Sequence, residues 1–241
     1  MRYNFSDKVV LITGGTGALG KTLVKKFIAT GATIVVTYNT DKKVADLRQE
    51  IKKTDELELL KTDITKEDQI VKLISDIVER YDHLDILVNV VGGYLGGKSV
   101  AELSEREWDT MMNMNLKSAF LISKHAIPVM KSRRYVTGGK IVHISSRTGL
   151  KSGGYDSAYA ASKSGLIRLV ESISQETKEH NINVNCVLPS IIDTESNRKA
   201  MPDTDFSKWV KAEDLANVIL FLCSEESKVI TGAAIPAYGL S

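Results

Sequence analysis

Short, almost continuously apolar runs alternate with amphipathic helical segments along all 241 residues of the chain. Such runs are typical of parallel strands buried on both faces, because half-exposed strands alternate apolar with polar residues. The predicted strands cover residues 8–12, 33–37, 57–61, 84–89, 140–145, 183–188 and 233–236. Helical patterns follow the first six, at about 18–30, 42–53, 66–81, 104–131, 158–180 and 211–224.

This order predicts an α/β fold with one Rossmann-type, doubly wound parallel β-sheet of about seven strands and helices on both faces. Right-handed crossovers should join its strands. The length fits a single domain over residues 1–241. The least patterned stretch, residues 190–210, is long enough to form a lid over a substrate.

The first predicted strand leads into a glycine-rich loop at residues 13–20 and then into a helix. Gly15, Gly17 and Gly20 have the Gly-x-Gly-x-x-Gly spacing, which lets the backbone turn sharply and approach a pyrophosphate. The helix that follows presents free N–H groups and its positive dipole end to the same anion. This context favours a dinucleotide site over the alternative, a tight glycine turn without a ligand.

Tyr159 and Lys163 are four residues apart in a predicted helix, so their side chains share one face. A nearby positive charge favours the phenolate, so we expect Lys163 to lower the pKa of Tyr159. Such a phenol can give or take a proton at a carbonyl or alcohol oxygen, which Ser146 at a predicted strand end could hold. For one pair taken alone, a solvated helix face is the alternative. The same spacing recurs outside the helical patterns, at Tyr38/Lys42 and Tyr94/Lys98.

Together the loop, the tyrosine–lysine pair and the upstream serine resemble the short-chain dehydrogenase/reductase family, over essentially the whole chain. Within that family the chain looks most similar to the 3-oxoacyl-carrier-protein reductases. Other family landmarks are matched in order and spacing by residues 88–92, 114–116, 145–149, 185–194 and 230–232. The chain departs from the family pattern at Ala18, Val90, Val91 and Ser190.

The resemblance implies an NAD(P)-dependent oxidoreductase that transfers a hydride between nicotinamide and a carbonyl or secondary alcohol, with 3-oxoacyl-thioester reduction as one candidate. Tyr159 would exchange the proton, and Lys163 would lower its pKa and bind the nicotinamide ribose. Ser146, with Ser145 as the alternative, would position the carbonyl oxygen. Asn115 would hold a water in a proton relay behind Lys163.

The resemblance also implies a set of cofactor-binding residues. They are Gly14, Thr16, Gly17, Leu19, Gly20, Tyr38, Asn39, Asp63, Ile64, Asn89, Val90, Gly92, Tyr159, Lys163, Pro189, Ile192 and Thr194. For Asp63 the alternative is a helix N-cap, a role that Thr65 could also fill.

The choice between NAD and NADP depends on the residue after the second predicted strand, where NAD sites usually carry a carboxylate for the ribose diol. Tyr38 stands there, so no acid would repel a 2′-phosphate, but no arginine is present and Gly17 lacks a basic side chain. Side chains that could hold the phosphate are Thr37, Asn39, Thr40 and Lys42. We therefore favour NADP over NAD, with dual use as the alternative.

The substrate is not specified by the sequence. Cations near the expected pocket favour an anionic or carrier-linked carbonyl compound, unless they are ordinary solvated loop charges: Arg147, Lys151, Arg198 and Lys199. A sugar or alcohol dehydrogenase and a pteridine or quinone reductase are alternatives. A non-catalytic NAD(P)-binding redox sensor is the alternative from another class, and the complete catalytic set argues against it.

The composition excludes several other classes. The net charge is +2 with basic and acidic residues interleaved, which disfavours nucleic-acid and membrane-surface binding. The histidines are scattered without ligand spacing, so no metal site is expected: His83, His125, His143 and His180. Cys186 and Cys223 lie in apolar runs and should be reduced core thiols.

The chain shows no signal peptide and no apolar stretch long enough to cross a bilayer, so we expect a cytoplasmic protein. The family resemblance implies a homotetramer or homodimer that packs through the helices predicted at 104–131 and 158–180. Apolar residues on more than one face of these helices agree with a second buried face, although a deeply buried core helix would look the same.

Overall fold

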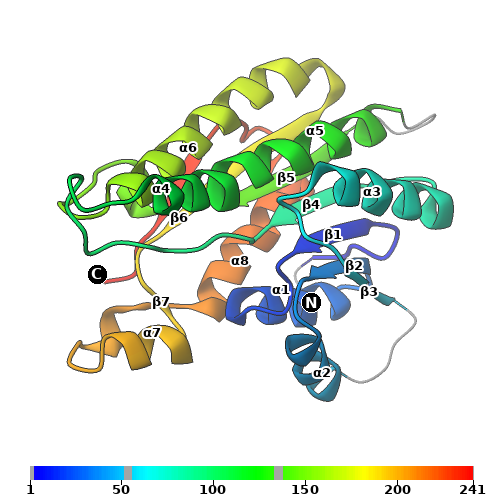
Figure 1. The fold of residues 1–241 in the computed structure, drawn as a ribbon. Helices are drawn as coiled ribbons and strands as arrows, with labels where there is room; N and C mark the ends of the chain where they lie inside the picture. Colours follow the sequence, from blue (N-terminus) through cyan, green and yellow to red (C-terminus); the bar gives the residue numbers. More distant parts are fainter. Residues whose placement is uncertain (1–2, 52–55, 133–137, 241) are drawn as a thin grey trace.

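The computed structural model describes residues 3–51, 56–132 and 138–240, which form a parallel sheet between two layers of helices (Figure 1). The strand order is β3-β2-β1-β4-β5-β6-β9. These strands are β1 Val9–Thr13, β2 Thr33–Tyr38, β3 Leu57–Lys61, β4 Ile86–Asn89, β5 Gly139–Ile144, β6 Ile182–Pro189 and β9 Ala234–Ala237. The helices are α1 Ala18–Ile28, α2 Asp41–Glu50, α3 Glu67–Tyr81, α4 Glu105–Met111, α5 Ser118–Lys131, α6 Ser157–Thr177, α7 Glu195–Ala200 and α8 Ala212–Cys223.

Each central strand contributes side chains to two separate hydrophobic cores. In β1, Val10 and Ile12 pack with α1 and α8 on one face, whereas Val9 and Leu11 pack with α3, α5 and α6 on the other. All four side chains are at most 4% exposed. Burial on both faces explains why the strands read as continuous apolar runs, and it confirms the predicted doubly wound fold.

Two regions differ from the elements read from the sequence. The helix predicted at 104–131 is interrupted by a π-helical stretch, Met112–Lys117, between α4 and α5. The unpatterned residues 190–210 contain α7, the short strand β7 Ile192–Asp193 and the first residue of β8 Val210–Lys211, and the two strands pair in parallel. Elements this short lie below the length at which a periodic pattern can be recognised.

The sheet topology determines where a ligand can bind. From β1 the chain crosses to β2 and β3 on one side, and then returns to β4 on the other. The loops after β1 and β4 therefore diverge, which leaves a crevice at the carboxyl ends of the strands.

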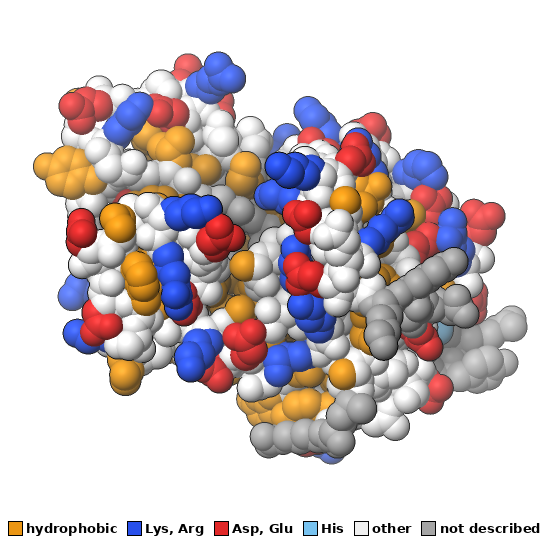
Figure 2. Space-filling model, turned by 90° about the horizontal axis from the view of Figure 1, so that it is seen from below, with side chains coloured by type: hydrophobic (Ala, Val, Ile, Leu, Met, Phe, Trp, Pro, Cys, Tyr) orange, Lys and Arg blue, Asp and Glu red, His pale blue; other side chains and the backbone are white. Residues whose placement is uncertain are grey.

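The face seen in Figure 2, viewed from below Figure 1, carries lysine and arginine interspersed with acidic side chains. None of the described helices is both long enough and apolar enough to cross a membrane. Within residues 3–51, 56–132 and 138–240, no three His, Cys, Asp or Glu side chains converge as metal ligands would.

Candidate active site

The glycine-rich loop turns from the buried end of β1 into α1. Gly14 has a positive φ of 67°, and a Cβ on Gly20 would lie 2.6 Å from the Cα of Gly15. Both positions therefore need glycine for the turn to form. The N-cap residue of α1, Gly17, makes no side-chain capping bond, so the N–H groups of the first helical turn remain available to an anion.

A crevice of about 400 Å³ extends from this loop across the ends of the neighbouring strands. Most of the cofactor residues expected from the sequence line it: Gly14, Thr16, Gly17, Leu19, Gly20, Tyr38, Asn39, Asp63, Ile64, Val90, Gly92, Ile192 and Thr194. Sequence reasoning did not include Lys43, Thr62, Met114 and Asn197, which also line it. Lys43 lines the crevice and Lys42 does not. Which of these neighbouring residues faces the crevice depends on how α2 is rotated about its axis, and the sequence does not give this rotation.

A second cavity, of about 500 Å³, adjoins the crevice. Three expected catalytic residues line it, Ser146, Tyr159 and Lys163, together with Pro189 of the expected cofactor set, whereas Asn115 does not. The two cavities share four lining residues, Val90, Gly92, Ile192 and Asn197, so they form one continuous space. A dinucleotide in the crevice would extend from the glycine loop towards Tyr159.

Ser146 is held so that its hydroxyl can act as a donor. Its Oγ accepts hydrogen bonds from the Thr148 hydroxyl at 2.9 Å and from the Thr148 N–H at 3.3 Å. With both acceptor directions used, its own proton is free to point towards a partner in the cavity. Ser145 is engaged elsewhere, because its hydroxyl donates to the Lys163 carbonyl at 2.9 Å.

Burial dominates the acidity of Tyr159. It raises the pKa of this phenol, and hydrogen bonding to Ser146 lowers it by a smaller amount. The Lys163 ammonium instead donates to the Ile144 carbonyl at 2.8 Å and lies 5.8 Å from the centre of the Tyr159 ring. The expectation that Lys163 makes Tyr159 more acidic is therefore not met in this structure.

Lys163 itself is 4% exposed, and burial lowers its pKa to about 8. Gly92 gives it room, since a Cβ there would lie 3.1 Å from the ammonium and 3.0 Å from the Asn115 Oδ1. The ammonium therefore faces the part of the cavity that is shared with the crevice.

Asn115 lies in the π-helical stretch, a feature often found at functional sites. Its Oδ1 accepts from the Gly93 N–H at 2.8 Å, and its Nδ2 donates to the Gly93 carbonyl at 3.1 Å and to the Ser162 hydroxyl at 3.0 Å. Ser162 in turn donates to the Tyr159 carbonyl at 2.7 Å. Asn115 thus ties the loop after β4 to the helix that carries Tyr159 and Lys163.

Asn89 is the expected cofactor residue that lies apart from both cavities. Its side chain is buried and bonds to the Thr13 hydroxyl at 2.5 Å and to His143 Nδ1 at 3.1 Å. Burial lowers the pKa of His143 to about 3, so this ring is neutral at pH 7, and its Nε2 lies 3.1 Å from the Ser123 hydroxyl. This buried polar chain joins β1, β4 and β5 beneath the crevice, and only the folded sheet brings its members together.

Tyr94 lines the reactive cavity, and its ring packs edge-on against that of Tyr159 at 5.0 Å between ring centres. Its hydroxyl donates to Asp156 at 2.8 Å, and Gly97 N–H donates to the Tyr155 carbonyl at 2.8 Å. These contacts join the loop after β4 to the loop before α6 on either side of the reactive tyrosine.

The remaining predicted residues have local partners. The Asp63 carboxylate accepts from the Thr65 N–H and hydroxyl at 2.9 and 2.7 Å, and α3 begins with Lys66 as its N-cap, so neither residue caps that helix. Arg198 forms a two-pronged ion pair with Asp193, at 2.6 and 2.8 Å. Two more of the expected substrate cations have contacts: Lys199 pairs with Glu195, and Arg147 lies over the Tyr238 ring.

Comparisons with known proteins agree with this arrangement. Residues 8–205 match the family model described as short chain dehydrogenase. The chain is 32% identical to the 3-oxoacyl-[acyl-carrier-protein] reductase FabG of Thermotoga maritima, covering 95% of each chain. It is 33% identical to the NAD-dependent glycerol dehydrogenase of Listeria innocua, covering 95% of this chain and 92% of the relative. A solved structure described as ElxO with NADP bound has a TM-score of 0.87 at 29% identity, covering 96% of this chain and 97% of that one.

The fold and these similarities define the protein as an NAD(P)-dependent oxidoreductase. It belongs to the short-chain dehydrogenase family, as its sequence landmarks indicated.

Proposed function

We propose that this oxidoreductase uses NADPH to reduce a ketone to a secondary alcohol, with 3-oxoacyl thioesters as the leading substrate class. One observation carries the proposal. Ser146 and Tyr159 line one cavity of about 500 Å³ that opens directly onto the dinucleotide crevice. A relative that carries the name of a 3-oxoacyl reductase supports the substrate class.

The residues that line the crevice leave space for a nicotinamide dinucleotide. Gly17 leaves open space beside the first turn of α1, because a Cβ there would meet only the Gly14 carbonyl, at 3.5 Å. Gly92 leaves space where the crevice meets Lys163. The glycine loop would hold the pyrophosphate, and Lys163 would bind the ribose hydroxyls beside the nicotinamide.

The bound nicotinamide supplies the hydride, and the protein supplies the proton and the positioning. Ser146 donates a hydrogen bond to the carbonyl oxygen, because Thr148 occupies its acceptor directions. Tyr159 then gives its proton to that oxygen as negative charge develops there. A pKa raised by burial keeps Tyr159 protonated at neutral pH, which suits an acid that acts in the reductive direction.

The preference for NADP rests on the side chains after β2. Tyr38 carries no charge that would repel a 2′-phosphate, and Lys43 lines the same end of the crevice. A structural neighbour with NADP bound supports this choice. Fluorescence titration with NADPH and NADH tests it. Tighter binding of NADPH supports the proposal, and tighter binding of NADH favours the oxidation of an alcohol, as the name of the glycerol dehydrogenase relative indicates for that enzyme.

The acidic-substrate hypothesis now rests on Arg147, which lines the reactive cavity. Lys151 does not line it, and Arg198 and Lys199 are paired with carboxylates. We further propose that residues 190–210 act as a lid, since Ile192, Thr194 and Asn197 border the crevice. For Arg147→Ala, KM should rise for acidic 3-oxo compounds and stay constant for neutral ones. An unchanged KM for both would remove the argument for an anionic substrate.

The decisive variant is Tyr159→Phe, which keeps the ring and removes the acid. We expect kcat to fall by about 10²–10⁴-fold while NADPH binding is retained, because only proton transfer is lost. Tyr155→Phe is the matched control, since Tyr155 is 65% exposed in the adjoining loop. A wild-type protein that binds NADPH but reduces no compound in a panel of 3-oxoacyl thioesters, ketones and quinones would contradict the proposal. That result would favour a non-catalytic redox sensor.

A further inference from the structure

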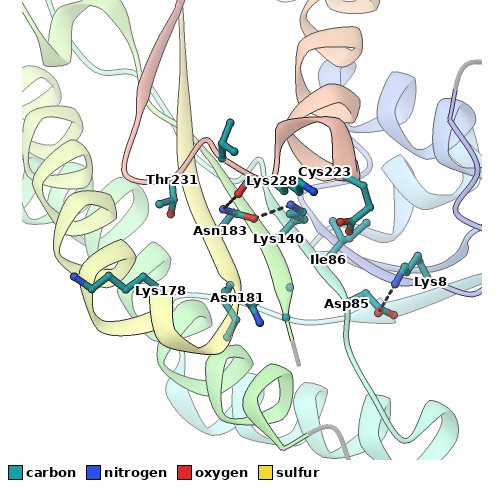
Figure 3. A pocket seen from close by; sticks show the side chains of 15 residues that line it. Lys8, Asp85, Ile86, Lys140, Lys178, Asn181, Asn183, Cys223, Lys228 and Thr231 are labelled. Atoms are coloured by element: carbon teal, nitrogen blue, oxygen red, sulfur yellow. Dashed lines mark hydrogen bonds and ion pairs between the residues drawn. The ribbon is translucent and has the colours of Figure 1, made fainter. Parts of the chain in front are cut away.

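A separate cavity of about 590 Å³ lies at the opposite edge of the sheet, where β4, β5 and β6 begin (Figure 3). The crevice for the dinucleotide lies at the carboxyl ends of the same strands, so the two spaces lie at opposite ends of the sheet. The volume falls within the range of about 300–1,000 Å³ that is common for small-molecule sites. None of the residues lining this cavity belongs to the catalytic or cofactor sets.

Lys140, near the start of β5, lines this cavity although the residue is only 7% exposed. Its ammonium donates to the Asn183 Oδ1 at 2.7 Å, and the Asn183 Nδ2 donates to the Lys228 carbonyl at 3.0 Å. The second bond fixes which way the amide faces, so its oxygen must point to the lysine (Figure 3). An ammonium has three N–H donors, and Asn183 accepts from one of them.

Within the described residues, no carboxylate lies close enough to form an ion pair with Lys140. Asp85, a buried acid of the lining, accepts from the Val9 N–H at 2.8 Å and from Lys8 at 3.4 Å. Glu225 is exposed, and its charge only partly counteracts the burial that lowers the pKa of Lys140. A buried ammonium without a counter-ion is costly unless something else compensates its charge.

The net charge of the described lining is positive, like that of Lys140 itself. Among the described residues that line the cavity, two are acids, Asp85 and Glu225. Four others of this described lining are lysines: Lys8, Lys140, Lys178 and Lys228. An excess of positive charge around a polar space attracts anions, and the attraction is strongest at the least hydrated charge.

We propose that this cavity binds a small multivalent oxyanion, carried by a phosphate or a polycarboxylate, with the Lys140 ammonium as its principal contact. The anion would accept the N–H donors that Asn183 leaves unused and would supply the missing negative charge. Asn183 would act as a positioning residue that holds the ammonium towards the cavity.

The test compares thermal unfolding of the full chain in inorganic phosphate and in chloride at equal ionic strength, with NADPH present to occupy the dinucleotide crevice. A ligand that binds the folded state raises Tm by mass action. Phosphate also stabilises proteins through general exclusion from their surface, but this effect is shared by all variants. The informative quantity is therefore the difference in Tm gain between wild type and variant.

We expect the Tm of wild type to rise in phosphate by about 2–4 °C more than that of Lys140→Met, which keeps the length of the side chain and removes the charge. Lys72→Met is the matched control and should keep the full gain, because the Lys72 side chain on α3 is 75% exposed. Asn183→Asp places a carboxylate beside Lys140 and should also remove the gain. It tests the site independently if Lys140→Met does not fold.

Equal phosphate gains in wild type, Lys140→Met and Asn183→Asp would overturn the proposal, because the effect would then be general. A citrate series distinguishes the two sources of the anion. A Lys140-dependent gain in phosphate alone identifies a phosphate site, and one in citrate alone identifies a polycarboxylate site. The comparison does not depend on the proposed reaction, since the variants leave the crevice unchanged and the same difference can be measured without NADPH.

Discussion

Burial, more than pairing with neighbouring charges, sets the protonation of single residues in the active site. It raises the pKa of Tyr159, lowers that of Lys163 to about 8 and lowers that of His143 to about 3. The reactive tyrosine is thus protonated and the core histidine neutral at pH 7. Lys163 is the member of this group whose charge changes just above neutrality.

The pKa of Lys163 leads to a pH dependence of cofactor binding. A lysine whose pKa is lowered keeps its charge below about pH 8 and loses it above. If its ammonium binds the ribose, the dissociation constant for NADPH should rise by no more than about twofold between pH 7 and 8. Above pH 8 it should rise, approaching tenfold per pH unit, because binding must then also recover a proton. Fluorescence titrations from pH 7 to 9.5 measure this.

Lys163→Met provides the comparison for that series. It should bind NADPH more weakly at pH 7 and show no rise above pH 8, since the titrating group is gone. A wild-type constant that stays level up to pH 9.5 would mean that the ammonium makes no contribution to holding the cofactor.

At the scale of elements, two loops act as a pair around the reactive tyrosine. The Tyr94 hydroxyl bonds to Asp156, and the Tyr94 ring packs against Tyr159. Tyr94→Phe keeps the ring and removes the bond between the loops, which is worth about 0.5–1.5 kcal/mol net. We expect KM for the carbonyl substrate to rise by about 2–10-fold, with NADPH affinity unchanged. Steady-state kinetics of Tyr94→Phe measure this, with Tyr155→Phe as the control variant. Equal KM values for the two variants would show that the contact between the loops does not shape the substrate site.

The sequence predicted the long elements well for a physical reason. Strands buried on both faces and helices of three or more turns repeat their apolar pattern often enough to be recognised. The π-helical stretch Met112–Lys117 and the short α7 lack such a repeat and were not predicted. Their positions depend on tertiary contacts, such as the bonds from Asn115 to Gly93 and Ser162.

The site was predicted unevenly for a related reason. Glycine spacing and the Tyr159–Lys163 spacing are local, so the glycines of the loop that line the crevice and this reactive pair could be named in advance. The hydrogen bond from Tyr94 to Asp156 spans 62 positions, and the contact of Asn89 with His143 spans 54. No pattern within one segment encodes such pairs.

At the scale of the whole molecule, one sheet presents different chemistry at its two ends. The carboxyl ends of the strands carry the glycine loop, the crevice and the reactive tyrosine, whereas the amino ends carry the lysine-lined cavity. Strand β5 connects the two ends of the sheet. Lys140 lies near its start, and the carbonyl of Ile144 at its other end accepts a hydrogen bond from the Lys163 ammonium. The two sites therefore share strand β5, although each can be tested separately.

The exposed apolar residues of α4 and α5 support the expectation of a homotetramer or homodimer. Met111, Leu121 and Ile122 of this region are buried in the protein, but Trp108 and Phe120 are 40% and 45% exposed.

An interface would bury Trp108 and Phe120, so Phe120→Glu should shift the protein towards monomer by placing a charge against apolar surface. Sedimentation velocity at micromolar concentration measures the mass. Val71→Glu, at a 49% exposed position on α3, is the control and should leave the assembly intact. A wild-type protein that sediments as a monomer would contradict the expectation, and an intact assembly of Phe120→Glu would place the interface elsewhere.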